Sequence, residues 1–403
     1  VIPVNEAEQL IMSRLLPLAV QKTPLLHAHA LTLCEPLIAD RDYPPFDRVA
    51  MDGYAVTFAA WQNGVRRFRV EGLQTAGLSP LTRKAHDGAI EIMTGAKLSE
   101  GCDLIVRYED TRRVDDFMEI TVDLEAVPYA NVHRKAADAR AGDRYEDKVI
   151  NPPLAAIAAS FGYATVRTAR KPRVTVIGTG DELVGIDKTP SDFQIRESNV
   201  HAVDMALRAR GYDVEAKVLR DDRALIRGQI ESALELSDML LLSGGVSAGK
   251  TDFVPSLLLE LGVNKVFHRI IQKPGKPLWF GRTDSGKVVF GLPGNPVSTL
   301  ICLYRYVLPF LKASELGEYK SANAPHAELL SYKPSLRKLT HFLPVKLEWT
   351  HDARILARGT EHNGSGDFIS LNGTDGFLEI PGESEPGYDA DQKYFRFYGW
   401  DGC

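Results

Sequence analysis

Three short apolar runs, each followed at once by a glycine-containing loop, constrain the fold of this chain more than any other feature of its sequence. A short run of leucine or β-branched residues that ends in glycine is typical of a buried strand in a parallel sheet. Amphipathic segments of helical length separate the loops or follow the last of them. Strands that alternate with helices in this way predict a doubly wound α/β domain. The runs with their loops, and then the helical segments, occupy residues 174–182, 239–249 and 288–296, and residues 199–210, 223–236 and 297–311.

The three loops are expected to form one anion-binding site. Ligands of doubly wound domains bind beyond the carboxyl ends of the strands, so the loops should share one edge of the sheet. Because glycine has no Cβ, such loops can turn N–H groups toward an anion and approach a phosphate closely. Neither the P-loop pattern nor the dinucleotide fingerprint is present, and each loop alone is equally compatible with a structural turn. Three loops on one edge favour the anionic ligand, and their candidate binding residues are Gly180, Asp181, Ser243, Gly244, Gly245, Ser247, Pro293, Gly294 and Asn295.

Carboxylates beside these loops suggest a Mg²⁺ site. Asp221 lies just after the end of the strand predicted over residues 214–219, and Asp252 follows the second loop. Mg²⁺ binds through one or two carboxylates plus substrate oxygens, so these two aspartates are candidate metal ligands. Asp222 could also bind the metal, but its place before the helical segment favours a role as helix cap.

Basic residues approach the same expected site. Lys273 and Lys276 stand in a rigid turn rich in proline and glycine, and Arg269 precedes them by four residues. Lysines held in such a turn beside an anion pocket favour phosphate binding over a merely solvated surface. Ser365 belongs to a further glycine loop, which could either reach the ligand or simply turn a hairpin.

Two acidic residues in the first half of the chain are further candidates. Asp52 lies in a stretch with a double proline, a second acid and an arginine, where an Asx-type turn and a catalytic role are both open. Thr94 stands at the end of a predicted strand, where its hydroxyl could donate a hydrogen bond. Asp138 closes a basic cluster with Arg134 and Lys135, which could meet phosphate or form a solvated turn.

Composition and charge exclude several classes of protein. The net charge of −5 and an isoelectric point near 6.1 argue against a general nucleic-acid binder. The apolar runs are too short for a membrane span, and the first residues lack the pattern of a signal peptide. No histidine pair has the spacing of a transition-metal site. We therefore expect a cytoplasmic protein that keeps its cysteines reduced, since no metal or redox spacing links Cys34, Cys102, Cys302 and Cys403.

The regions outside the α/β domain divide into helical and β patterns. Apolar residues at helical spacing predict a helical opening over residues 4–33, which Pro17 and Pro24 interrupt. An alanine-rich helix is predicted over residues 150–161. Alternating apolar residues predict a mostly β domain over residues 57–127 and a small terminal β domain from residue 327 to residue 403.

These motifs keep the order of a known family and span nearly the whole chain. The stretch from Pro44 to Ala55 resembles the signature opening of the molybdopterin molybdenumtransferase family, which includes MoeA and the gephyrin E domain. Each motif is modest alone, but the ordered set is specific. The other matching motifs are residues 92–96, residues 179–183, residues 243–247 with Asp252, and residues 273–277, 291–296 and 365–368.

The resemblance implies a multidomain fold. Its parts would be a doubly wound α/β domain of the MoaB/MogA type, a discontinuous helical domain, a β-rich insertion and a C-terminal β-barrel. It also implies an elongated homodimer whose active cleft combines the α/β domain of one subunit with the helical and β domains of the other. The four domains would occupy residues 171–318, residues 1–42 plus 125–170, residues 43–124, and residues 325–403.

The implied reaction transfers molybdenum from molybdate to adenylylated molybdopterin. Mg²⁺-dependent hydrolysis would release AMP and leave molybdenum cofactor, and the adenylyltransferase that makes the substrate is an implied partner. The matching positions imply catalytic roles for Asp52, Thr94, Asp138 and Glu182, metal binding by Asp221 and Asp252, and substrate binding by Arg269, Lys273, Lys276 and Ser365.

Two positions depart from the family pattern. Ala136 stands where the family usually has glycine, which leaves the conformation of the loop before Asp138 open. Residues 337–342 lack the Gly-Arg pair that the family usually shows before a phenylalanine, so no basic residue of the C-terminal domain is assigned to the ligand.

Two other functions fit parts of the pattern. A related enzyme that shares the α/β domain adenylylates molybdopterin with ATP, but it lacks the flanking domains found here. A scaffold with this fold binds a partner peptide, as the gephyrin E domain does for receptor loops, but it has no need of Asp52, Asp138, Asp221 and Asp252 together. The transferase is therefore the favoured function.

Overall fold

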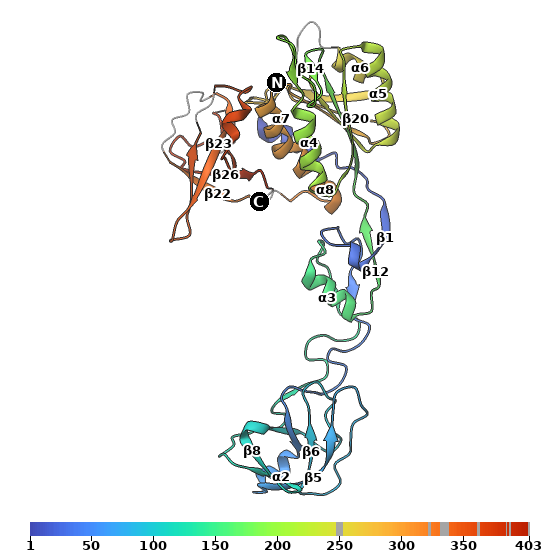
Figure 1. Ribbon diagram of the computed structural model, residues 1–403, viewed down its shortest axis with the longest axis vertical. Coiled ribbons are helices and arrows are strands. Elements are labelled where there is room, and N and C mark those ends of the chain that lie inside the picture. Colours follow the sequence, from blue (N-terminus) through green and yellow to red (C-terminus); the bar gives the residue numbers. More distant parts are fainter. Residues whose placement is uncertain are drawn as a thin grey trace. The chain divides into compact units, whose positions relative to one another are not determined.

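The computed structural model describes residues 1–246, 253–320, 324–330, 338–360, 363–383, 385–386 and 388–401. Contacts within the chain divide it into two compact units (Figure 1). The first unit comprises Val1–Gln21 and Thr168–Cys403, and the second comprises Lys22–Arg167. Within the described residues, no helix has both the length and the apolar character that a membrane span requires. The four-domain division of the sequence remains a prediction.

A six-stranded sheet forms the centre of the first unit. Its four strands β16, β13, β17 and β21 are parallel neighbours in this order, which confirms the predicted doubly wound α/β domain. Beyond β21 the sheet continues with β20, which is antiparallel to β21, and with β18, which is antiparallel to β20. The strands span Asp213–Leu219 (β16), Arg173–Thr179 (β13), Met239–Ser243 (β17), Val288–Leu292 (β21), Trp279–Thr283 (β20) and Val263–His268 (β18).

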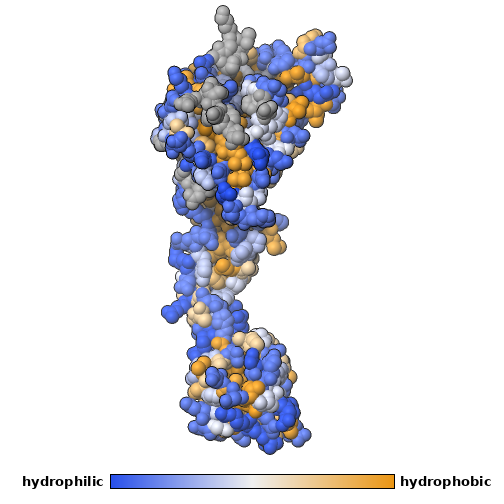
Figure 2. All heavy atoms as spheres, turned by 90° about the vertical axis from the view of Figure 1, so that its left-hand side faces the viewer, coloured by the Kyte–Doolittle hydropathy of each residue, from blue (hydrophilic) through white to orange (hydrophobic). Residues whose placement is uncertain are grey.

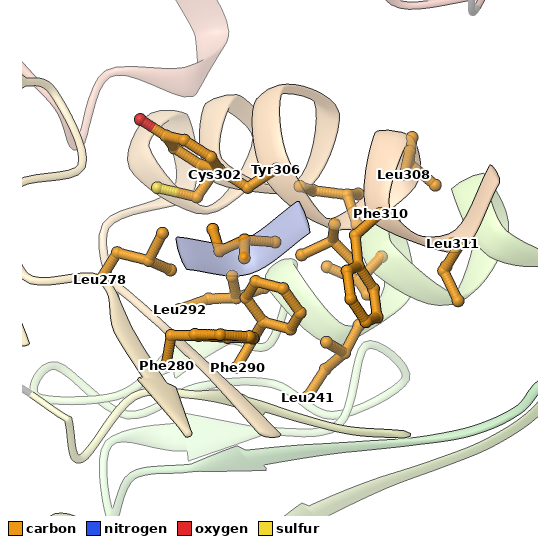
Figure 3. Close-up of a cluster of buried hydrophobic side chains, with 14 of the residues drawn as sticks. Leu241, Leu278, Phe280, Phe290, Leu292, Cys302, Tyr306, Leu308, Phe310 and Leu311 are labelled. Carbon is orange, nitrogen blue, oxygen red and sulfur yellow. The ribbon is translucent and has the colours of Figure 1, made fainter. Parts of the chain in front are cut away.

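Helices cover both faces of this sheet, because its central strands are apolar along their whole length. Leu241 of β17 packs with Phe290 and Phe310 in a core that α1, α4, α7 and α8 share (Figure 3). Its neighbours Leu240 and Leu242 point to the opposite face, into a core with α5 and α6. These helices span Val4–Met12 (α1), Asn199–Arg208 (α4), Arg223–Leu236 (α5), Val254–Glu260 (α6), Pro296–Cys302 (α7) and Leu308–Leu316 (α8), with the π-helical turn η3 (Leu303–Val307) between the last two.

The helical opening predicted over residues 4–33 is wrong beyond Met12. Helix α1 ends there, and β1 (Val20–Pro24) and the 3₁₀ turn η1 (Leu25–His27) follow. Pro17 and Pro24 disfavour helical backbone at the residues before them, and β1 instead finds a partner in β12 (Thr165–Ala169). The apolar stripe of α1, formed by Val4, Ala7 and Ile11, is buried in the core of the α/β domain.

The C-terminal part of the first unit is a closed five-stranded barrel, which confirms the barrel that the family resemblance implies. Its strands follow the order β23-β24-β22-β26-β25, and pairing of β23 with β25 closes the circle. A short strand from the α/β region, β19 (Gln272–Lys273), runs parallel to β23 at its edge. The barrel strands span His326–Leu330 (β22), Thr340–Trp349 (β23), Ile355–Gly359 (β24), Gly376–Ile380 (β25) and Tyr394–Gly399 (β26), and η4 covers Phe368–Leu371.

The second unit contains a six-stranded sheet with the order β7-β4-β6-β5-β9-β8, which agrees with the β-rich region predicted over residues 57–127. A smaller core lies between residues 28–39 and helix α3, which spans Pro152–Ser160. The strands span Gly53–Val56 (β4), Arg67–Gln74 (β5), Gly88–Ile92 (β6), Leu104–Arg107 (β7), Thr111–Val114 (β8) and Phe117–Ile120 (β9). Short elements of the two units are β2 (Leu37–Ile38), β3 (Arg48–Val49), α2 (Phe58–Gln62), η2 (Tyr108–Asp110), β10 (Val132–His133), β11 (Arg144–Tyr145), β14 (Leu183–Val184) and β15 (Ile195–Arg196).

Candidate active site

A cavity of about 650 Å³ lies in the first unit, where the parallel strands β13, β17 and β21 end. All three predicted glycine loops contribute to its wall, together with the lysine turn and one loop of the C-terminal region. The cavity therefore lies at the edge where a doubly wound domain binds its ligand. The predicted site residues in its lining are Gly180, Glu182, Asp221, Gly244, Gly245, Lys273, Lys276, Pro293, Gly294, Asn295 and Ser365.

The second glycine loop lies directly against the first. Gly244 has a φ of +91°, and a Cβ at this residue would lie 2.5 Å from the carbonyl oxygen of Thr179. Only glycine satisfies both the left-handed backbone and this close approach. The Thr179 hydroxyl is buried beneath Gly245 and has no hydrogen-bond partner among the described residues.

The third loop is tied to two other parts of the chain. The Asn295 side chain donates a hydrogen bond of 2.7 Å to the Ser365 hydroxyl, which brings the C-terminal loop to the cavity. Asn199 at the start of α4 donates to the Ser243 hydroxyl at 3.0 Å and to the Gly294 carbonyl at 2.8 Å. Asn199 therefore links the second and third loops, a role that the sequence analysis missed.

The two lysines reach the cavity from the turn after β19. Lys273 and Lys276 are exposed, and neither forms an ion pair with any residue that the structure describes. Their turn is held by Gln272, which is 1% exposed and lies beneath it. Two cationic groups without an internal partner leave this wall of the cavity able to bind an anion.

Carboxylates provide the negatively charged groups of the site. Asp221 and Glu182 line the cavity, and the Glu182 side chain folds back over Gly180. The Asp181 carboxylate accepts a hydrogen bond of 3.1 Å from the Asp221 backbone N–H. Asp222 accepts from the Leu225 N–H at 2.8 Å, which confirms its predicted role as the cap of α5.

A Mg²⁺ site at Asp221 is compatible with this donor set. The described residues contain no cluster of three or more histidine, cysteine or acidic side chains that could hold a metal on their own. Mg²⁺ needs only one or two protein carboxylates when substrate oxygens and water complete its shell. Asp252, the second predicted ligand, and Ser247 lie outside the described residues.

Three predicted residues are absent from the described lining of this cavity. Ser243 is buried and accepts the hydrogen bond from Asn199. The Asp181 carboxylate accepts a hydrogen bond from the Asp221 backbone N–H. Arg269 has a φ of +84° and its backbone pairs with Ile2 and Leu278, so its main chain joins the N-terminus to the sheet.

The remaining candidates, Asp52, Thr94 and Asp138, belong to the second unit. The Thr94 backbone N–H donates to Asp52 Oδ1 at 2.6 Å, and this hydrogen bond lowers the pKa of the Asp52 carboxyl below its ordinary value. Asp138 Oδ1 lies 2.8 Å from His133 Nε2, and His133 Nδ1 lies 3.1 Å from an Arg48 nitrogen.

The loop before Asp138 keeps a conformation that favours glycine. Ala136 has a φ of +60°, in the left-handed region, and its N–H donates to the Pro44 carbonyl at 3.0 Å. This explains why glycine suits the position and shows that alanine also adopts the required backbone here.

Comparison with known proteins decides the family. Residues 2–162 match the MoeA N-terminal region (domain I and II), residues 175–313 a probable molybdopterin binding domain, and residues 326–390 the MoeA C-terminal region (domain IV). The chain is 39% identical over 377 residues to the molybdopterin molybdenumtransferase of Synechocystis, an alignment that covers 93% of both chains. The chain belongs to the molybdopterin molybdenumtransferase (MoeA) family.

Further MoeA proteins resemble the chain in sequence and in structure. The molybdopterin molybdenumtransferase of Haemophilus influenzae is 34% identical over 296 residues, which is 72% of each chain. The crystal structure of a molybdopterin biosynthesis MoeA protein from Pyrococcus horikoshii matches all of both chains with a TM-score of 0.82 and 30% identity. These MoeA relatives extend over both units, so the family assignment applies to the whole chain.

Proposed function

We propose that this chain inserts molybdenum from molybdate into adenylylated molybdopterin and releases AMP. The name of its relatives, molybdopterin molybdenumtransferase, supports the transfer of molybdenum to molybdopterin. The observation that carries the proposal is a cavity lined by glycine loops, by carboxylates and by two lysines that form no ion pair among the described residues. Such a site suits a substrate with a phosphoanhydride, whose negative charge needs both backbone donors and cations. Hydrolysis of that anhydride is the reaction step that the cavity supports.

The residues of the cavity divide the work by charge. Lys273, Lys276 and the N–H groups of the glycine loops bind the phosphate oxygens and stabilise the charge that develops on the leaving phosphate. Asp221 together with Asp252 would hold Mg²⁺, which when bound offsets the charge of the anhydride and polarises the bond that is cut. Glu182, which lines the cavity as Asp221 does, is proposed to be a catalytic residue that contacts the reacting groups.

A homodimer with shared clefts is part of the proposal. Asp52, Thr94 and Asp138 lie in the second unit, and in the dimer they would complete the cleft of the partner subunit. Apolar side chains on the first unit support burial by a second copy, because water solvates them poorly (Figure 2). Exposed examples are Phe193 (82%), Ile369 (75%), Met205 (72%), Ile186 (59%) and Ile195 (58%).

The direct test is AMP release from adenylylated molybdopterin, with and without molybdate and Mg²⁺. We expect AMP only when both are present, because Mg²⁺ would polarise the anhydride bond that water cleaves, and this hydrolysis is proposed to accompany transfer of molybdenum onto the dithiolene of the pterin. Tight binding of the substrate without AMP release under any condition would support a scaffold instead. Synthesis of the adenylylated pterin from ATP would support the adenylyltransferase.

The shared cleft predicts complementation between two inactive variants. When Asp52→Ala and Asp221→Ala chains are co-expressed, about half of randomly assembled dimers are mixed, and one cleft of each mixed dimer has both aspartates. We therefore expect about a quarter of wild-type AMP release from the mixture and almost none from either variant alone. No recovery in purified mixed dimers would mean that both aspartates serve the same subunit's site.

The proposal extends to the setting of the reaction. An adenylyltransferase that supplies the adenylylated pterin is the proposed partner, since the substrate of one enzyme is the product of the other. We propose a cytoplasmic location, which the free thiols of Cys34, Cys102 and Cys302 support.

A further inference from the structure

The turn that carries Lys273 and Lys276 rests on one buried side chain. The Gln272 amide nitrogen donates hydrogen bonds to the Pro274 carbonyl at 3.2 Å and to the Gly275 carbonyl at 3.1 Å. Gln272 itself is 1% exposed. Without this amide, both carbonyl groups would lose these hydrogen bonds at the bottom of the turn, and a buried polar group without a partner is costly.

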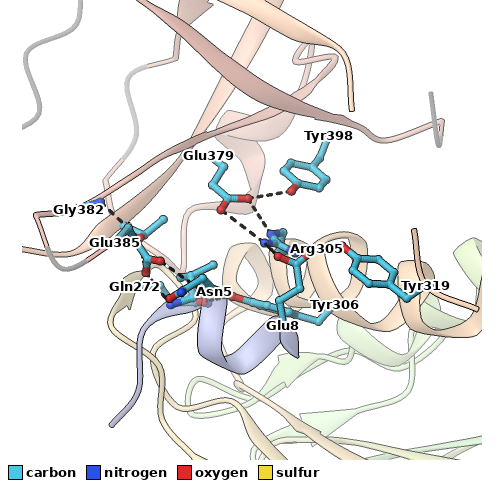
Figure 4. A network of polar contacts seen from close by, with 12 residues as sticks. Asn5, Glu8, Gln272, Arg305, Tyr306, Tyr319, Glu379, Gly382, Glu385 and Tyr398 are labelled. Atoms are coloured by element: carbon cyan, nitrogen blue, oxygen red, sulfur yellow. Dashed lines mark hydrogen bonds and ion pairs between the residues drawn. The ribbon is translucent and has the colours of Figure 1, made fainter. Parts of the chain in front are cut away.

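A second layer fixes the Gln272 side chain in turn (Figure 4). The Tyr306 hydroxyl, in the π-helical turn η3, donates to Gln272 Oε1 at 2.5 Å. The Cys302 sulfur lies 3.7 Å from both the Gln272 nitrogen and the Gly275 carbonyl oxygen. A Cβ at Gly275 would lie 2.6 Å from that nitrogen, so the turn is in close contact with its support.

The barrel restrains the same segment from the other side. Gln272 and Lys273 pair with Thr340 and His341 of β23, and the Thr340 N–H donates to the Ile271 carbonyl at 3.1 Å. The backbone on either side of Gln272 is therefore fixed, and the side-chain amide fixes the turn that follows. The lysine side chains, which are long and flexible, start from a defined backbone.

We propose that Gln272 is a positioning residue, which with Tyr306 holds the lysine turn so that both ammonium groups face the substrate phosphate. The inference rests on the proposed function in one respect, namely that the lysines bind the phosphoanhydride. Ordering a lysine side chain costs conformational entropy. A rigid turn reduces the part of this cost that substrate binding must offset. Because Gln272 is 1% exposed and its amide is directed to the turn, its proposed effect on the reaction is exerted through the lysines.

The test replaces Gln272 by methionine, which has a similar length but neither donates nor accepts these hydrogen bonds. We expect KM for adenylylated molybdopterin to rise about tenfold and kcat/KM to fall by up to about 10²-fold, because displaced lysines bind the phosphate less well. Tyr306→Phe should change KM in the same direction by a smaller factor. Gln229→Met, which removes a half-buried glutamine bonded to Lys217 away from the cavity, should leave both parameters unchanged.

A multiple mutant separates positioning from general destabilisation. In a Lys273→Ala/Lys276→Ala background, Gln272→Met should lower kcat/KM by less than about twofold, since the groups it positions are gone. If Gln272→Met lowers kcat/KM in this background by as large a factor as it does in the wild type, the inference is overturned. If Gln272→Met does not fold, Tyr306→Phe decides in the same background, and an unchanged KM in the single Tyr306→Phe variant would count against the proposal.

A binding measurement keeps this inference distinct from the proposed function. Calorimetric titration with inorganic pyrophosphate reports on the lysines whether or not the wild type releases AMP. We expect weaker pyrophosphate binding by Gln272→Met than by wild type at a temperature where circular dichroism shows both proteins to be fully folded. Absence of AMP release in the wild type would refute the proposed function alone, whereas equal pyrophosphate affinity of the two proteins would refute the positioning role.

Discussion

Replacement of Asp221 by alanine is expected to reduce AMP release by about three orders of magnitude while the protein stays folded. Asp221 is an exposed residue that lines the cavity, so the fold does not depend on burial of its side chain. Loss of a metal-binding carboxylate would leave the charge of the anhydride uncompensated, which costs several kcal/mol in the transition state. The measurement is AMP release at saturating Mg²⁺, with circular dichroism as the check of folding.

The adjacent aspartate supplies a matched control. Asp222→Ala removes the same carboxylate one residue later, but Asp222 caps α5 through the Leu225 N–H. It should lower the free energy of unfolding by about 1 kcal/mol and leave AMP release nearly intact. We expect Asp252→Ala to behave like Asp221→Ala. Unchanged turnover in either of those two variants would remove the metal-site assignment.

The sequence predicts the parallel part of the sheet well because the signal is local. Apolar runs such as Val174–Ile177 and Met239–Leu242 are buried on both faces, so their composition alone indicates strands of a covered parallel sheet. The glycines that end them must lie at the carboxyl edge, and this is where the cavity is found. The cap at Asp222 is equally local, since its hydrogen bond joins two residues that are three positions apart, Asp222 and Leu225.

Features that depend on distant partners could not be predicted in the same way. Strand β20 runs antiparallel to both of its neighbours, β21 and β18, because of how the chain returns to the sheet, and no short pattern encodes that direction. Residues 20–24 form a strand because residues 165–169 pair with them. Asn199 and Gln272 have no motif that marks them, because their importance comes from carbonyl and hydroxyl groups that folding brings to them.

A buried ion cluster predicts a large effect on stability rather than on catalysis. Arg305 is 1% exposed and lies between Glu8 of α1 and Glu379 of the barrel (Figure 4). Its guanidinium contacts Glu8 Oε2 at 3.0 Å and Glu379 Oε2 at 2.7 Å. Tyr319 donates to Glu8, and Tyr398 donates to Glu379 at 2.8 Å. The cluster therefore joins α1, η3 and the barrel within the first unit.

Arg305→Met is expected to lower the free energy of unfolding of the first unit by about 3–5 kcal/mol, because the largely buried carboxylates of Glu8 and Glu379 lose their counter-ion. Calorimetry should show a lower Tm for this unit. Arg354→Met is the control, because Arg354 also pairs with two carboxylates, Glu328 and Asp352, but is half exposed, so its Tm should not change measurably. Further replacement of Glu8 and Glu379 by glutamine in the Arg305→Met protein should recover most of the loss.

The pH dependence of this effect follows from Glu8. Burial raises the pKa of its carboxyl, but the charge and hydrogen bonds of Arg305 and the hydrogen bond from Tyr319 outweigh burial and leave the pKa below the ordinary value. A carboxyl group whose pKa is lower in the folded state than in the unfolded state stabilises the fold at pH values above its unfolded-state pKa. This stabilisation is lost as the pH falls through the folded-state pKa of the group. In Arg305→Met the effect of burial on Glu8 is opposed only by the hydrogen bond from Tyr319 and the charge of Arg396, so Glu8 should titrate at higher pH than in the wild type and be most destabilising near neutrality. The gap in Tm between wild type and Arg305→Met should thus be largest near pH 7 and narrow below about pH 4. A gap that stays constant across this range would show that Arg305 stabilises the unit through packing of its side chain and not through its charge.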